Sequence, residues 1–234
     1  MAKKVNPMIT VPFTYSELYS KTIKVTTSMY ADLEEFAAYK VTIEDVQYLD
    51  NLVDELINMQ TDKTMRNLIS TETEAKAKKR EVISETMRSI ALRAKVVLGA
   101  ASAKSRSLNA GNISKIRDAE LELIARRIYN DALAELEALS TVGLTKEDLD
   151  KFYADIDEFS LSAEKVKTAI INRELIAEKR QAIGAEIYSL LCKYCGFGKM
   201  IFAKKSRVRY KHYVLNKSKK KRDEEPEEEI STEN

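Results

Sequence analysis

Apolar residues recur every three or four positions along most of this chain, which is the spacing of helices that bury one face. A clear example lies between residues 46 and 56, where the apolar positions are three, four and three apart: Val46, Leu49, Val53 and Leu56. Runs that alternate like strands between turn residues are scarce. The pattern therefore predicts an all-α protein.

A short stretch with the features of a turn between two helices occurs twice. Residues 142–149 read Val-Gly-Leu-Thr-Lys-Glu-Asp-Leu, with a glycine suited to a helix end, a threonine suited to an N-cap and acids suited to a first helical turn. Residues 39–46 carry the same Thr-x-Glu-Asp order 103 positions earlier. Each stretch predicts a tight turn that makes its two flanking helices antiparallel.

The match continues beyond the turns. The apolar positions of the following helices pair at the same interval: Val46 with Leu149, Leu49 with Phe152, Val53 with Ile156 and Leu56 with Phe159. After a shortening of three residues, Lys79-Arg80 aligns with Lys179-Arg180, and Ile83 aligns with Ile183. We interpret the chain as a tandem duplication of a helical-hairpin unit, which becomes stable when the two copies dock.

The first copy is expected to contain three helices. The first begins at Thr14 or Ser16 as N-cap. Its predicted apolar face consists of Ile23, Tyr30, Leu33 and Ala37, with Thr26 or Thr27 filling the gap. The second begins after Thr42. Its apolar stripe weakens around residues 60–64, where we favour a break or kink over one continuous rod. A third helix then runs to about Ser102.

The second copy follows a polar linker at residues 103–114. Its first helix runs to about Thr141, with a predicted apolar face of Leu121, Ile124, Ile128, Ala132, Leu136 and Leu139. A second helix begins after Thr145, and a third is expected from about Ser162. The glycines of residues 196–198 are expected to bend or end that third helix.

The predicted fold is an elongated antiparallel helical bundle built from two tandem helical-hairpin repeats. The repeats cover residues 14–104 and 115–203 and form one bundle. Residues 1–13 contain two prolines and no helical period, so we expect an extended N-terminal arm. Residues 204–234 are basic and then acidic, and we expect a largely disordered tail.

Charge is unevenly distributed only near the C-terminal end. The chain has 234 residues and a net charge of +2, yet residues 204–222 hold ten Lys or Arg and no acid, and residues 223–229 hold six acids. Tyrosines lie among the cations, and basic residues mixed with aromatic rings suit nucleic acid. The candidate nucleic-acid or anion-binding residues are Lys204, Lys205, Arg207, Arg209, Lys211, Lys219, Lys220, Lys221 and Arg222. An anionic membrane surface or the neighbouring acids are alternative partners for this charge.

Few residues suit catalysis. His212 is the only histidine, which excludes the two-histidine patterns of zincin and ferritin-like di-iron sites. Cys192 and Cys195 form a lone Cys-x-x-Cys pair, which we interpret as two packed thiols in a helix rather than a redox pair or zinc ligands; zinc shared between two chains is the alternative. Residues 196–199 lack the spacing of a phosphate loop. We expect no enzymatic activity, no cofactor, no metal and no small-molecule substrate.

Arg80 and Arg180 occupy the same position in the two copies, in line with the apolar stripe that follows them. A symmetric pair of this kind could bind an anion. We favour a structural role, in which the aliphatic part of each side chain covers apolar surface and the guanidinium reaches a carboxylate. The candidate carboxylates are Asp54, Glu55, Asp157 and Glu158.

The compartment is predicted from the apolar content of the chain. No window has the roughly 18 uninterrupted apolar residues of a membrane helix. The opening residues lack the apolar segment of a secretory signal, and two cysteines are too few for a disulfide scaffold. These features predict a cytoplasmic protein without a transmembrane segment.

Residues 115–215 resemble a group of uncharacterised all-helical repeat proteins of Bacteroidota and their mobile elements. The resemblance lies in Gly143-Leu144-Thr145-x-x-Asp148-Leu149, in Arg180, and in Lys199-x-Ile201-Phe202 followed by Tyr210 and Tyr213. It implies an all-helical fold. The group has no known active site, so the resemblance implies no catalytic residue.

The functional expectation is a non-enzymatic helical scaffold or adaptor that acts through protein–protein contacts or self-association in a larger assembly. The alternative is a nucleic-acid-binding accessory protein that uses residues 204–222. A third possibility is a membrane-active helical protein that rearranges to expose Val96–Ala101 or Leu190–Phe202.

Overall fold

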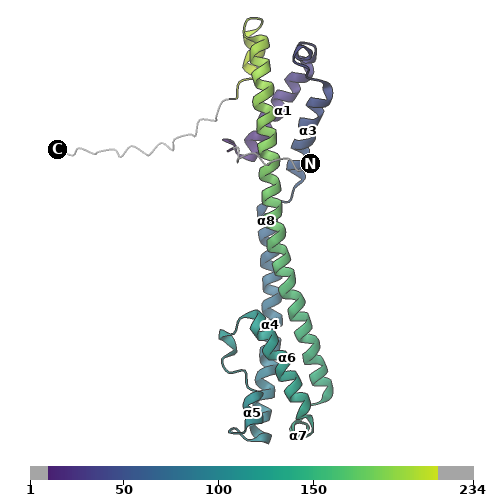
Figure 1. The fold of residues 1–234 in the computed structure, drawn as a ribbon, viewed down its shortest axis with the longest axis vertical. Helices are drawn as coiled ribbons and strands as arrows, with labels where there is room; N and C mark the ends of the chain where they lie inside the picture. Colours follow the sequence, from purple (N-terminus) through teal and green to yellow (C-terminus); the bar gives the residue numbers. More distant parts are fainter. Residues whose placement is uncertain (1–9, 216–234) are drawn as a thin grey trace, which may run out of the picture. The chain divides into compact units, whose positions relative to one another are not determined.

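The computed structural model describes residues 10–215, which are mostly helical and contain no strand (Figure 1). The all-α prediction is therefore confirmed. The chain divides into two compact units: Met1–Met59 together with Glu178–Asn234 form unit 1, and Gln60–Ala177 form unit 2. The longest helix, α8 (Lys146–Phe202), contributes its first part to unit 2 and its last part to unit 1.

Unit 1 is built on two antiparallel helices, α1 (Tyr15–Ala31) and α3 (Ile43–Asn58), which pack side by side (Figure 1). The short helices α2 (Leu33–Phe36) and η1 (Ala37–Tyr39) connect them. Residues 178–202 of α8 cover their apolar face, and α9 (Arg207–His212) packs against α1. The centre of this core consists of Leu18, Val25, Met29, Phe36, Val46, Leu49, Val53, Ile187, Leu191 and Tyr194.

Unit 2 has a corresponding set of helices. The helix α6 (Asp118–Ala134) is followed by α7 (Leu136–Ser140) and then by residues 146–177 of α8. The helix α4 (Asp62–Leu98) completes the core, and α5 (Ala103–Ser107) and η2 (Ile113–Lys115) lie between α4 and α6 in the chain. The centre of this core consists of Ile83, Met87, Ile90, Ala94, Leu121, Ile128, Leu139, Leu149, Phe152, Ile156 and Phe159.

The two turns that the sequence singled out have the same geometry. Lys40 and Gly143 both adopt a left-handed backbone, with φ of 56° and 79°. Thr42 and Asp45 form a capping box at the start of α3, in which the Thr42 N–H donates to Asp45 Oδ2 at 2.9 Å. The Thr145 N–H donates to Asp148 Oδ2 at 3.0 Å in the same way. These bonds satisfy backbone donors that the helix itself leaves unpaired.

The expected break between the second and third helices of the first copy is present. The helix α3 ends at Asn58, α4 begins at Asp62, and the Thr61 hydroxyl accepts a hydrogen bond from the Thr64 N–H at 3.1 Å. The expected helix start near Ser162 is wrong, because α8 continues through this position. The Ser162 hydroxyl donates to the Glu158 carbonyl at 2.9 Å, so it bonds within the helix instead of capping a new one.

The predicted apolar face of the first helix is wrong at Ile23 and Tyr30, although Thr26, one of the two threonines expected to fill its gap, is buried. Ile23 and Tyr30 are 40% and 41% exposed, whereas Thr22 and Thr26 are buried beside Leu18, Val25 and Met29. The Thr22 hydroxyl donates to the Leu18 carbonyl at 2.7 Å. This bond satisfies the polar group within the helix, so threonine can lie in the core at little cost.

The C-terminal segment differs from the expected tail over residues 204–215. Arg207–His212 form α9, and Tyr213 is fully buried in the core of unit 1. Residues 216–234 lie outside the described part of the chain. At the other end, residues 1–9 of the predicted arm are also outside it, and Phe13 packs against Tyr188 with ring centroids 5.8 Å apart.

The glycines of residues 196–198 lie inside α8, which continues to Phe202 and does not end at them as expected. Gly198 is required for packing, because a Cβ atom at this position would lie 2.2 Å from the Tyr213 ring. Gly196 has no heavy atom within 4 Å of the equivalent position. One glycine therefore accommodates the buried tyrosine, and the other has open space beside it.

The compact units are composed differently from the predicted repeats 14–104 and 115–203. Helix α4 follows α3 in the chain but belongs to unit 2, and the last part of α8 belongs to unit 1. The units are defined by packing and the repeats by sequence, so the repeat boundaries stay a prediction.

We predict that Gly198→Ala lowers the stability of the protein and Gly196→Ala raises it. The first substitution forces Tyr213 or α8 to move, which typically costs about 1–3 kcal/mol. The second restricts the unfolded chain and improves helix propensity, which contributes about 0.5–1 kcal/mol. Denaturant unfolding of both variants measures the difference. Equal stability of the two would contradict the packing role of Gly198.

Candidate interaction surfaces

The nine candidate anion-binding residues have different environments. Lys204, Lys205, Arg207 and Lys211 are exposed within or beside α9. Arg209 is instead paired with carboxylates: its Nη1 lies 3.1 Å from Asp32 Oδ1 and 3.5 Å from Glu35 Oε1. The remaining four, Lys219, Lys220, Lys221 and Arg222, lie outside the described residues.

Arg209 belongs to a polar contact that holds the C-terminal segment on unit 1. The Tyr213 hydroxyl donates to Asp32 Oδ2 at 2.7 Å, and Asp32 is only 5% exposed. Burial and the bond to this carboxylate raise the pKa of Tyr213. The Tyr213 ring stacks on Phe202 and lies against Phe36. Tyr213, which lies in the segment that the sequence suggested as an anion-binding tail, is therefore part of the core.

Further cations of unit 1 lie on the neighbouring helices. Lys24 on α1 is exposed and Lys199 on α8 is half-buried, both charges act on the Cys195 thiol, and α9 packs against α1. We call the set Lys24, Lys199, Lys204, Lys205, Arg207 and Lys211 the basic face. Between residues 10 and 215, no carboxylate forms an ion pair with any of these six. His212 lies beside the face, with its Nδ1 3.4 Å from the Ser28 hydroxyl.

A second surface, which the sequence analysis did not find, lies between α1 and α3. Four large apolar side chains are 40–53% exposed here: Tyr19, Ile23, Tyr30 and Ile57. The Tyr30 hydroxyl donates to Asp50 Oδ2 at 2.8 Å, and Asp50 Oδ1 is buried without a hydrogen-bond partner. We call this the α1/α3 face. It was missed because Ile23 and Tyr30 had been assigned to the core.

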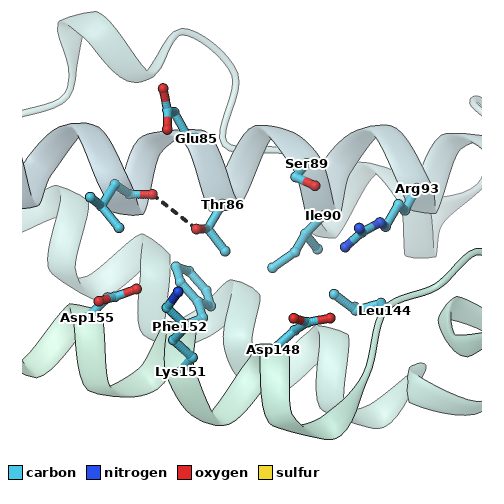
Figure 2. A pocket seen from close by; sticks show the side chains of 11 residues that line it. Glu85, Thr86, Ser89, Ile90, Arg93, Leu144, Asp148, Lys151, Phe152 and Asp155 are labelled. Carbon is cyan, nitrogen blue, oxygen red and sulfur yellow. Dashed lines mark hydrogen bonds between the residues drawn. The ribbon is translucent and has the colours of Figure 1, made fainter.

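The clearest groove in unit 2 lies between α4 and the start of α8 (Figure 2). Its volume is about 330 Å³, and its charged groups alternate in sign, with Glu85 and Arg93 on one side and Asp148, Lys151 and Asp155 on the other. Two of its polar groups already have local partners. The Thr86 hydroxyl donates to the Val82 carbonyl, and Asp148 caps α8. The groove therefore resembles a helix–helix seam more than a ligand site.

The two cysteines have opposite environments. Cys195 is buried, and burial raises the pKa of its thiol to about 12, whereas Cys192 is exposed.

Across residues 10–215, no cluster of three or more His, Cys, Asp or Glu side chains is arranged to hold a metal ion. In the part of the chain that the structure covers, no helix is both long enough and apolar enough to cross a membrane.

Arg80 has a structural environment. Its guanidinium donates to Asp118 Oδ1 at 2.6 Å and to the carbonyls of Ile113 and Ile116 at 3.1 and 2.6 Å. It therefore holds η2 and the first turn of α6 against α4. Burial raises the pKa of Asp118, but the hydrogen bonds and charges of Lys76 and Arg80 outweigh this, so the pKa is lowered overall.

Two of the four carboxylates named from the sequence, Glu55 and Glu158, pair with the neighbouring lysines instead, and Asp157 pairs with Arg126. Lys79 forms an ion pair with Glu158, and Lys179 Nζ lies 2.6 Å from Glu55 Oε1. Arg180 lies over the Tyr15 ring, with its guanidinium carbon 5.9 Å from the ring centroid.

Comparisons with known proteins add no family assignment. No protein-family model, no curated protein and no solved structure matches this chain.

We predict that Arg80→Ala lowers the free energy of unfolding by about 1.5–3 kcal/mol, because it removes hydrogen bonds made by a charged group. Arg88→Ala is the control, since Arg88 is exposed and lies 3.7 Å from Glu81; its effect should be near zero. The Arg80 effect should be complete well above pH 3.8, the ordinary pKa of Asp. It should shrink as the pH falls through the lowered pKa of Asp118, because protonation removes the charge of the partner.

We also predict that a thiol-alkylating reagent at pH 8 labels one cysteine of the folded protein and both cysteines of the unfolded protein. Cys195 is shielded and remains a thiol at this pH, whereas Cys192 is accessible. Mass spectrometry gives the number and position of the labels. Fast labelling of Cys195 in the folded protein would contradict its burial in unit 1.

Proposed function

We propose that this chain is a duplicated helical scaffold or adaptor that acts through the outer faces of its helices. The duplication is supported by positions that the sequence comparison had not used. Buried residues in the first halves of the two copies correspond at an interval of 103: Leu18 with Leu121, Val25 with Ile128, Met29 with Ala132, Phe36 with Leu139 and Val41 with Leu144. The helices α1 and α6 also end 103 residues apart.

The ion pairs support an exchange of third helices between the copies. Glu55 and Glu158 are 103 residues apart, and Lys79 and Lys179 are 100 residues apart. Lys79 pairs with Glu158, while Lys179 pairs with Glu55. Each lysine thus reaches the glutamate of the other copy. The three-residue difference between the intervals equals the length of the non-helical link 59–61 between α3 and α4, which has no counterpart within α8.

The observation that carries the scaffold function is an apolar stripe on α8 within unit 2. Leu161, Ile171 and Leu175 are 54–58% exposed, with the exposed Glu164 and Thr168 between the first two. At 100° per residue they lie on one side of the helix, opposite the buried Val166 and Ala169. An exposed stripe of this kind suits an amphipathic helix of a protein partner. The resemblance to Bacteroidota repeat proteins carries no known activity, so the proposal rests on this surface.

A cytoplasmic location is part of the proposal, since both cysteines are free thiols and suit a reducing compartment. The alternative function, nucleic-acid binding, is favoured by the basic face, in which Lys24 and Lys199 add charge to the C-terminal segment. Exposure of Leu190–Phe202, one form of the membrane-active alternative, would require unit 1 to open, because Leu191, Tyr194 and Phe202 lie in its core.

The scaffold function is tested by purifying the tagged chain from the cells that produce it. We expect defined protein partners to co-purify with the wild type and to be lost from a variant that carries Leu161→Gln, Ile171→Gln and Leu175→Gln. The control variant carries Lys165→Gln, Lys167→Gln and Glu174→Gln on the same helix and should keep the partners. Unchanged melting temperatures would show that the variants are folded. Purification of the wild type without any partner, at the mass of one chain, would contradict the proposal.

Nucleic-acid binding is tested separately by gel retardation of DNA and RNA at low and moderate salt. Binding through the basic face should weaken steeply as salt increases, because counterions are released from the phosphates. Failure to retard either polymer at low salt would remove this alternative.

A further inference from the structure

The two sequence repeats carry different side chains at the outer surface between their first two helices. In unit 2 this surface is closed by Arg126, whose Nη2 lies 3.1 Å from Glu122 Oε1 and 2.8 Å from Asp157 Oδ1. The guanidinium carbon also lies 5.4 Å from the centroid of the Tyr153 ring. The Ser160 hydroxyl donates to Glu122 Oε2 at 3.1 Å and completes the network.

The corresponding positions in unit 1 do not form this network, but one of them is also a carboxylate. The residues 103 positions before Arg126, Glu122 and Ser160 are Ile23, Tyr19 and Ile57, which are apolar or aromatic and 40–53% exposed. The residue 103 positions before Asp157 is Asp54. Asp54 is exposed and forms no ion pair within residues 10–215. The α1/α3 face thus has an acid without the arginine that its counterpart possesses.

This comparison specifies the chemistry of a ligand for the α1/α3 face. It must supply a cation to Asp54, as Arg126 does for Asp157, and apolar atoms to cover Ile23 and Ile57. The basic face has both properties. Val208 and Met200 are 69% and 63% exposed and lie next to Arg207 and Lys199 in the chain. The two faces lie on different sides of α1, since Ile23 and Tyr30 belong to one and Lys24 to the other.

We propose that the α1/α3 face of one protein molecule binds the basic face of a second molecule of the same protein. Val208 packs against Ile23 and Ile57, and Arg207 or Lys211 pairs with Asp54. Charge complementarity favours this encounter and makes it sensitive to salt. Each molecule carries both faces. The contact can therefore occur twice in a closed dimer, or it can repeat from one molecule to the next in an open chain. The proposal rests on the scaffold function and names self-association as part of it.

The test uses two variants of the full chain, each with one altered face. The first carries Arg207→Glu and Lys211→Glu, and the second carries Asp54→Lys and Ile57→Ser. All four side chains are exposed, so both variants should fold. The control carries Lys63→Glu and Lys78→Glu, which make the same charge change as the first variant, on exposed residues of unit 2. Sedimentation velocity and light scattering over a range of concentrations and salt measure the mass.

The wild type and the control should associate at low salt, and each face variant alone should associate about tenfold more weakly or not at all. An equimolar mixture of the two face variants should regain a two-chain complex, because each supplies the face that the other lacks. A wild type that stays monomeric at low salt would overturn the proposal, as would association that survives in both variants or a mixture that does not associate. Binding of a nucleic acid by a monomeric wild type would instead assign the basic face to that ligand. If the wild type does not self-associate but still binds partners through the α8 stripe, only this inference is overturned, and the scaffold function remains supported.

Discussion

Each pair of antiparallel helices in this protein leaves one apolar face that only a third helix can cover. The pairs are α1 with α3, and α6 with the first part of α8. A helical hairpin buries too little apolar surface to offset the conformational entropy lost on folding. In unit 1 the third helix comes from a distant part of the chain, residues 178–202, whereas in unit 2 it is α4, which precedes α6 within the continuous segment 60–177. Unit 1 therefore cannot form until residues far apart in the sequence have met.

Side-chain bonds to the short connecting segments complete each unit. Arg80 binds two carbonyls of the segment before α6, and Tyr213 binds the carboxylate of Asp32 at the end of α1. Both bonds satisfy polar groups at a helix boundary, where the helix itself leaves donors or acceptors unpaired. The segments around α5 and α9, which looked like a linker and a tail, are held in place by these bonds. The outer faces that remain carry the proposed interactions.

Buried positions were predicted correctly from the sequence where a single effect, the burial of apolar side chains, decided the structure. The stripes of α3 and of the start of α8 are wholly apolar, so every position named in them is buried, although the buried Leu52 of α3 was not named. The predictions were wrong where two effects competed. Thr22 is polar by composition but buried, because its hydroxyl finds the Leu18 carbonyl. Ser162 could cap a helix or bond within one, and nothing local decides between these outcomes. The α1/α3 face was missed for the same reason, since assigning Ile23 to the core removed it from the surface.

The sequence by itself determined the all-helical class, the two turns and most of the buried stripes, because spacing, capping residues and the left-handed turn position act locally. The candidate cations were also named from the sequence, but not their roles. Only the tertiary structure decided that Arg209 pairs with a buried carboxylate while Arg207 remains exposed. It also decided which third helix covers which pair, because that choice depends on contacts between residues more than a hundred positions apart, such as Glu55 and Lys179.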